Sequence, residues 1–85
     1  MTNVLQRYAY DGVPREEAVW WTLRREATPG EAVCRMFTHL FGHELRLEVR
    51  GHLVQSDVCR TDEAVLDVQE RWRAGLEAEG WTKGV

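Results

Sequence analysis

The segment His43–Arg50 alternates strictly between apolar and polar side chains. Its apolar positions are Leu45, Leu47 and Val49, and its charged positions are Glu44, Arg46, Glu48 and Arg50. Because successive side chains of a β-strand point to opposite faces, this pattern predicts a strand that is buried on one side and solvated on the other. The chain must therefore build a sheet and supply an element that covers its apolar face.

That cover is predicted near the C-terminal end, as a helix over about residues 62–79. Thr61 is a favourable N-cap, and two acidic residues follow it at the positive end of the helix dipole. The apolar positions recur at spacings of three and four and form one stripe, made of Val65, Val68, Trp72 and Leu76. Gly80 fits the left-handed position that ends a helix, with Trp81 packing back on the last turn.

Three further strands complete the predicted sheet. Gly51-His52 is expected to form a tight turn after the alternating strand, and Thr28-Pro29-Gly30 to join the first two strands. The expected fold is α+β and a single domain over residues 1–85. It is an antiparallel four-stranded β-meander of strands at about 17–26, 31–41, 43–50 and 53–60, with the helix packed on one sheet face.

Adjacent tryptophans, Trp20 and Trp21, make the first strand the most consequential prediction. Pro14 favours an alternative in which residues 14–27 are helical, whereas the β-branched and aromatic centre favours a strand. In the strand, one face carries Val19, Trp21 and Leu23, and the other carries Ala18, Trp20 and Thr22. The two indoles then point apart, and one helix covers only one of them.

Composition narrows the classes of function. The net charge of −3 over 85 residues disfavours a nucleic-acid role driven by bulk charge, since phosphate binding needs a clustered basic surface. The chain has no apolar run of about 18 residues and no signal peptide, so a cytoplasmic protein without a membrane contact is expected. Cys34 and Cys59 are too few to define a disulfide framework. Residues 1–16 are expected to form an edge strand or an N-terminal arm.

Residue patterns typical of catalysis or cofactor binding are not found, so we expect neither an enzyme nor a cofactor. Ser56 is the only serine and lacks the context of a nucleophile. His39 and His43 flank a predicted turn and are weak candidates for metal ligands, but their spacing matches no common zinc pattern. No metal site is predicted.

The expected function is a small non-catalytic domain for protein interaction or self-association, homodimeric through the sheet face that the helix leaves uncovered. Exposed apolar patches with aromatic and arginine side chains mark such surfaces. The predicted interaction surface consists of Trp20, Val33, Arg35, Phe37, His39 and Phe41. Two alternatives stay open: an N-terminal arm with Leu5, Tyr8 and Tyr10 folds over this face, or its arginines and aromatics bind single-stranded nucleic acid.

Overall fold

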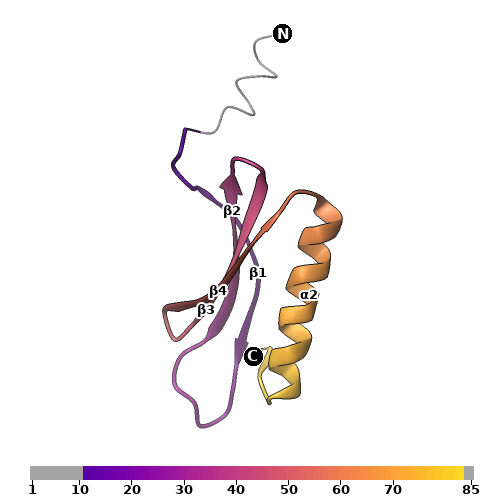
Figure 1. Ribbon diagram of the computed structural model, residues 1–85. Coiled ribbons are helices and arrows are strands. Elements are labelled where there is room, and N and C mark those ends of the chain that lie inside the picture. The colour runs from indigo at the N-terminus through magenta and orange to yellow at the C-terminus, as the bar shows by residue number, and fades with distance from the viewer. Residues whose placement is uncertain (1–10, 84–85) are drawn as a thin grey trace.

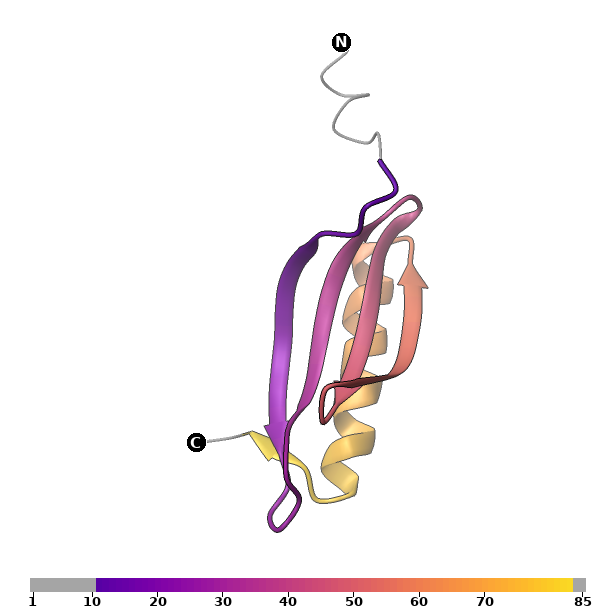
Figure 2. The same ribbon diagram turned by 90° about the vertical axis from the view of Figure 1, so that its left-hand side faces the viewer.

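The computed structural model describes residues 11–83. The elements are β1 (Glu16–Arg24), β2 (Ala32–His39), β3 (Gly42–Val49), β4 (His52–Cys59), α2 (Asp62–Ala78) and β5 (Thr82–Lys83). The antiparallel sheet has the order β4-β3-β2-β1-β5, and α2 runs across one of its faces (Figure 1). No described segment covers the other face (Figure 2). The predicted meander and its C-terminal helix are confirmed, whereas the short β5 was not expected.

The tryptophan pair lies in β1, so the helical alternative for residues 14–27 is wrong. The register places Val19 opposite Arg35 and Trp21 opposite Cys34, with a bulge between them. This bulge corrects the expected alternation, because an extra residue turns Val19 and Trp21 to opposite faces. Trp21 is the core tryptophan, with 7% of its surface exposed, whereas Trp20 is 36% exposed.

The hydrophobic core lies between the sheet and α2. It contains Trp21, Leu23, Ala32, Cys34, Leu45, Leu47, Cys59, Val65, Val68, Trp72 and Trp81. The leucines of β3 therefore pack with the apolar stripe of α2, as predicted. The buried indole of Trp21 donates a hydrogen bond of 3.0 Å from Nε1 to Oε1 of Gln69, which satisfies a polar group that burial removes from water.

Both ends of α2 follow their sequence signals. The Thr61 hydroxyl accepts a hydrogen bond from the backbone N–H of Ala64 at the start of the helix. Gly80 has a φ of 97°, and the N–H of Trp81 donates to the carbonyl of Leu76 over 3.1 Å. This is the pattern of hydrogen bonds that closes a helix through a left-handed residue. It turns the chain back so that β5 pairs with the end of β1.

The turn between β3 and β4 lies one residue earlier than predicted. Its two residues are Arg50 and Gly51, with φ angles of 56° and 81°. Positive φ at both positions matches the twist of the flanking strands. Residues 11–15 form no strand, and the predictions for Leu5, Tyr8 and Tyr10 lie outside the described residues. In the part of the chain that is described, no helix has the length and apolarity needed to cross a bilayer.

Candidate functional site

The outer face is the side of the sheet that points away from α2. Residues paired across antiparallel strands share a side of the sheet. The residues of the outer face are therefore the cross-strand pairs that alternate with the pairs buried against α2. They are Glu16, Val19 and Thr22 on β1, Val33, Arg35 and Phe37 on β2, Glu44, Arg46 and Glu48 on β3, and Leu53, Ser56 and Val58 on β4.

A network of charged side chains occupies the centre of the outer face. Arg35 donates hydrogen bonds to Glu48 over 3.0 Å and to Glu16 over 3.1 Å. The hydrogen bond to Glu48 raises the pKa of Arg35, and the bond to Glu16 adds to this effect. Arg46 lies directly opposite Arg35 in the register and pairs with Glu44 over 2.9 Å. The carboxylates therefore offset the repulsion between two arginines that lie opposite each other.

The exposed apolar side chains lie at the two margins of this face rather than at its centre. Val19 and Trp20 are exposed on β1, and Leu53 and Val58 are 58% and 41% exposed on β4. In the centre, Val33 is buried, and the guanidinium of Arg46 lies 4.1 Å from the ring centroid of Phe37. The outer face is thus a charged strip between two apolar margins.

The predicted surface residues fall into three places. Val33, Arg35 and Phe37 lie together in the central strip, with Arg35 at its middle and not at a rim. Trp20 lies at the bulge in β1. His39 and Phe41 lie at the β2–β3 turn, where their ring centroids are 5.8 Å apart and the guanidinium of Arg60 stacks on Phe41 at 4.6 Å.

The structure also places the second weak metal candidate. Nδ1 of His43 lies 2.7 Å from a carboxylate oxygen of Glu17, and its Nε2 lies 3.8 Å from Asp62. Among residues 11–83, no three His, Cys, Asp or Glu side chains are grouped so that they could hold a metal ion. The contact between His43 and Glu17 instead ties the start of β3 to β1.

Both cysteines are free and buried in the core. Cys34 is on β2 and Cys59 is on β4. Since β3 lies between these two strands, the cysteines do not form a disulfide between adjacent strands. Burial raises the pKa of Cys34 to about 12. Burial and the charge of Asp57 raise the pKa of Cys59. Both thiols therefore stay protonated near neutral pH, where a protonated buried thiol is a poor nucleophile and metal ligand.

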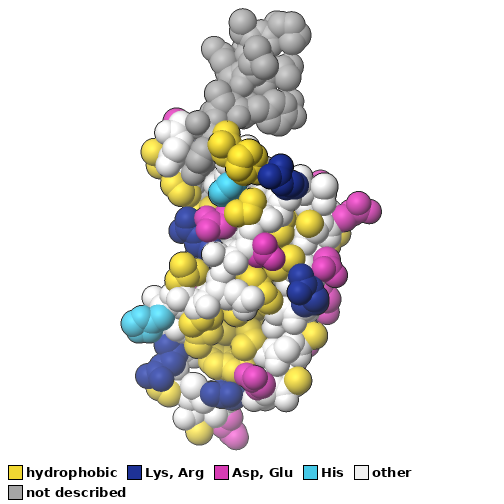
Figure 3. All heavy atoms as spheres, viewed as in Figure 1, with side chains coloured by type: hydrophobic (Ala, Val, Ile, Leu, Met, Phe, Trp, Pro, Cys, Tyr) yellow, Lys and Arg dark blue, Asp and Glu magenta, His cyan; other side chains and the backbone are white. Residues whose placement is uncertain are grey.

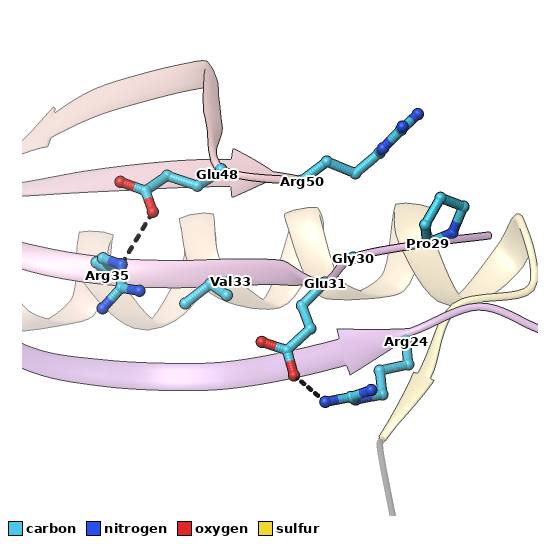
Figure 4. Close-up of a pocket in the computed structure, with 9 residues that line it drawn as sticks. Arg24, Pro29, Gly30, Glu31, Val33, Arg35, Glu48 and Arg50 are labelled. Carbon is cyan, nitrogen blue, oxygen red and sulfur yellow. Dashed lines mark hydrogen bonds and ion pairs between the residues drawn. The ribbon is translucent and has the colours of Figure 1, made fainter.

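A hollow of about 590 Å³ opens on the outer face near the β1–β2 and β3–β4 connections. Figure 4 shows Glu48 directed toward Arg35 and Glu31 toward Arg24, while Arg50 points away from both pairs. Arg24 is bonded to Glu31, so two of the three arginines here are already neutralised. The same holds for Arg46 outside the hollow. This mixed charge offers little to a nucleic-acid phosphate, which needs unpaired cations.

Sequence reasoning missed the β4 margin, formed by Leu53 and Val58. The available signal was a strand with weak alternation and a single charged residue, Asp57. Comparison of the chain with protein families, curated proteins and solved structures found no match. Function is therefore inferred from the surface described above.

Proposed function

We propose that this protein is a non-catalytic self-association domain that binds a second copy of itself through the outer face. The observation that carries the proposal is the pair of apolar margins on a sheet face that no described segment covers (Figure 2). Exposed apolar area gathered on one face supports an interaction surface. Tryptophan and arginine are enriched where interfaces gain most of their binding energy; Arg35 lies on this face, and Trp20 is exposed at the bulge beside it.

The size of the face supports the same proposal. Four strands of eight or nine residues span roughly 19 Å by 26 Å, or roughly 500 Å² of footprint. Side-chain relief increases the accessible area above this footprint, toward the roughly 800 Å² per partner that is typical of a stable interface. A contact of this size uses both apolar margins, so we expect the whole face to take part.

The charged strip is compatible with contact between two identical faces. Its two arginines and three glutamates are bonded within one chain, so the strip has little net charge to repel its copy. A two-fold axis, the commonest symmetry of protein oligomers, would place the β1 margin of one chain near a margin of the other. The cost is the partial desolvation of the ion pairs, which the apolar margins must offset.

The proposal includes a cytoplasmic location, where thiols stay reduced. It is supported by the two buried cysteines, whose separation by β3 leaves them without a disulfide partner in one chain. The outer face would then serve a homodimer or, in the same way, another protein.

Light scattering on purified protein at high micromolar concentration tests the proposal. We expect a mass above that of one chain, and Trp20→Arg should lower this mass because a charge replaces an exposed anchor at the β1 margin. Leu40→Arg is the matched control, since Leu40 is exposed in the β2–β3 turn outside the outer face. A wild-type monomer at this concentration contradicts the proposal. Salt-sensitive binding of a single-stranded oligonucleotide would favour the nucleic-acid alternative instead.

A further inference from the structure

The two edges of the sheet differ in how well they are protected. Along β1, β5 pairs with the last two residues, and two bulges interrupt the rest of the strand. Glu16 and Glu17 add charge to the same edge. Bulges, charges and short covering segments are the usual means by which proteins prevent a free edge from pairing with another chain.

The β4 edge has few of these protections. It is eight residues long, contains neither lysine nor proline, and carries one charged side chain, Asp57. Its only pairing with a described strand is to β3. Leu53, Val54 and Val58 are all more than 40% exposed. Figure 3, which views this side of the molecule, shows hydrophobic side chains gathered most densely between the strands and α2.

We propose that β4 pairs antiparallel with β4 of a second copy, so that two chains share one continuous sheet. In an antiparallel ladder, alternate residues direct their N–H and C=O groups away from the strand they already pair with. The edge of β4 therefore presents a row of donors and acceptors that no described strand uses, and an identical strand matches them. This contact runs along the backbone edge of β4 rather than across the outer face, and it goes beyond the function proposed above.

The sequence of β4 selects a register centred on Ser56. With Ser56 opposite Ser56 of the second copy, Gln55 lies opposite Asp57, and Val54 lies opposite Val58. This register places an amide against the one carboxylate and aliphatic side chains against each other. Centring on Asp57 would instead bring two carboxylates together, which is destabilising for directly opposed residues.

The bulge in β4 lies outside the central pairs of this register, those of Gln55, Ser56 and Asp57. It falls between the residues paired with Leu47 and Glu48, at the turn end of the strand. Gln55 to Cys59 keep a regular pairing with β3. The strand is therefore straight where Ser56 and its neighbours would meet their copies, and the irregularity falls at Val54.

The symmetry of this contact differs from that of the outer-face contact. In the edge contact, the two outer faces lie on the same side of the shared sheet, which requires a two-fold axis perpendicular to the sheet. In the outer-face contact, the two sheets pack face to face about a two-fold axis parallel to the sheets. If both contacts form, two perpendicular two-folds close a tetramer. An edge eight residues long spans only about 27 Å, so the edge contact is small, and we expect it to be reversible at micromolar concentrations.

Engineered cross-linking tests the register directly. In a ladder centred on Ser56, its two Cα atoms lie about 4.5–5.5 Å apart, within the roughly 4.4–6.8 Å that a disulfide spans. We expect Ser56→Cys to give a disulfide-linked dimer under mild oxidation. Val58→Cys is the matched control, because its two copies would be about 13 Å apart along the ladder. The native cysteines are buried and present in both variants.

Equal cross-linking of the two variants, or none at Ser56→Cys, overturns the proposal. A second measurement separates it from the outer-face contact. Val54→Lys should raise the dissociation constant about tenfold or more, an amount that corresponds to roughly 1.4 kcal/mol, because lysine at a strand edge opposes pairing. Leu66→Lys, at a similarly exposed site on α2, should leave the constant unchanged.

Hydrogen exchange gives the readout specific to the backbone. Alternate amides of β4 should become protected as the wild-type concentration rises, and this protection should disappear in Val54→Lys but persist in Trp20→Arg. Loss of protection in Trp20→Arg alone would assign self-association to the outer face and overturn the edge contact. If β4 stays protected in Trp20→Arg and light scattering gives this variant the same mass as the wild type, the outer-face contact is refuted and the edge contact remains supported.

Discussion

The two faces of the sheet use the same strands for opposite purposes. On the inner face, Trp21, Leu23 and Leu45 are buried against α2. On the outer face, Arg35 and its neighbours form a network of ion pairs that remains partly in contact with water. Burying a large apolar side chain contributes about 1.5–3 kcal/mol, whereas an exposed ion pair contributes at most about 1 kcal/mol.

This difference indicates that one face of the sheet stabilises the fold, whereas the other is available for function. A chain of this length has few large side chains with which to build a core, so it concentrates them on one face. The other face can then vary in chemistry without loss of the fold. Surface that adds little to folding is available for binding, and substitutions on the two faces should therefore have different consequences.

The tryptophan pair offers the sharpest way to break this comparison. Trp21→Ala should lower the free energy of unfolding by about 3–5 kcal/mol, because it removes a buried ring and leaves Gln69 without its hydrogen-bond donor. Trp20→Ala, one residue away, should cost less than about 1 kcal/mol. Urea unfolding of dilute, monomeric protein measures both values. Equal losses would mean that Trp20 also belongs to the core.

Much of the fold was predictable because its signals are local. The alternation of β3, the N-cap Thr61 and the left-handed Gly80 each act within a few residues, and each had the expected outcome. The strand at β1 also followed from its aromatic and β-branched centre. These signals sufficed to define the meander and the helix.

The rest depended on register, which local patterns do not contain. The bulge beside Trp20 places Val19 on the opposite side of the sheet from the one expected, and the neighbouring residues contain no pattern that predicts a bulge. The contact of Arg46 with Phe37 also requires two strands to be aligned. Of the predicted site, the central members Val33, Arg35 and Phe37 share a face, whereas the apolar margin of β4 appears only when the strand order is known.

The buried thiols provide a second way to sharpen the comparison, through pH. The pKa of Cys34 rises from near 9 to about 12 on folding, and that of Cys59 is also raised. The unfolded chain therefore releases these protons first as the pH increases. Stability from the neutral Cys34 thiol is complete below about pH 9 and is lost between about pH 9 and 12, by about 1.4 kcal/mol per pH unit. Cys59 changes stability in the same direction.

Urea unfolding between pH 8 and 11 should show this loss, with Cys34→Ala as the comparison. The variant should be less stable at pH 8 because a small cavity replaces the thiol. Its slope above pH 9 should nevertheless be shallower than that of the wild type, since one titrating group has been removed. Parallel slopes would show that other groups cause the pH dependence.

The smallest expected effect comes from the outer face. Arg35→Met removes the link between Glu16 and Glu48 but keeps an apolar stem at this position, so the free energy of unfolding should fall by less than about 1 kcal/mol. The loss should shrink at high salt, because ion pairs in contact with water are screened. Arg71→Met, which breaks the exposed pair with Asp67 on α2, is the matched control and should behave alike. A loss above about 2 kcal/mol for Arg35→Met alone would show that the charged strip stabilises the fold as the core does, and the separation of stability from binding between the two faces would then be wrong.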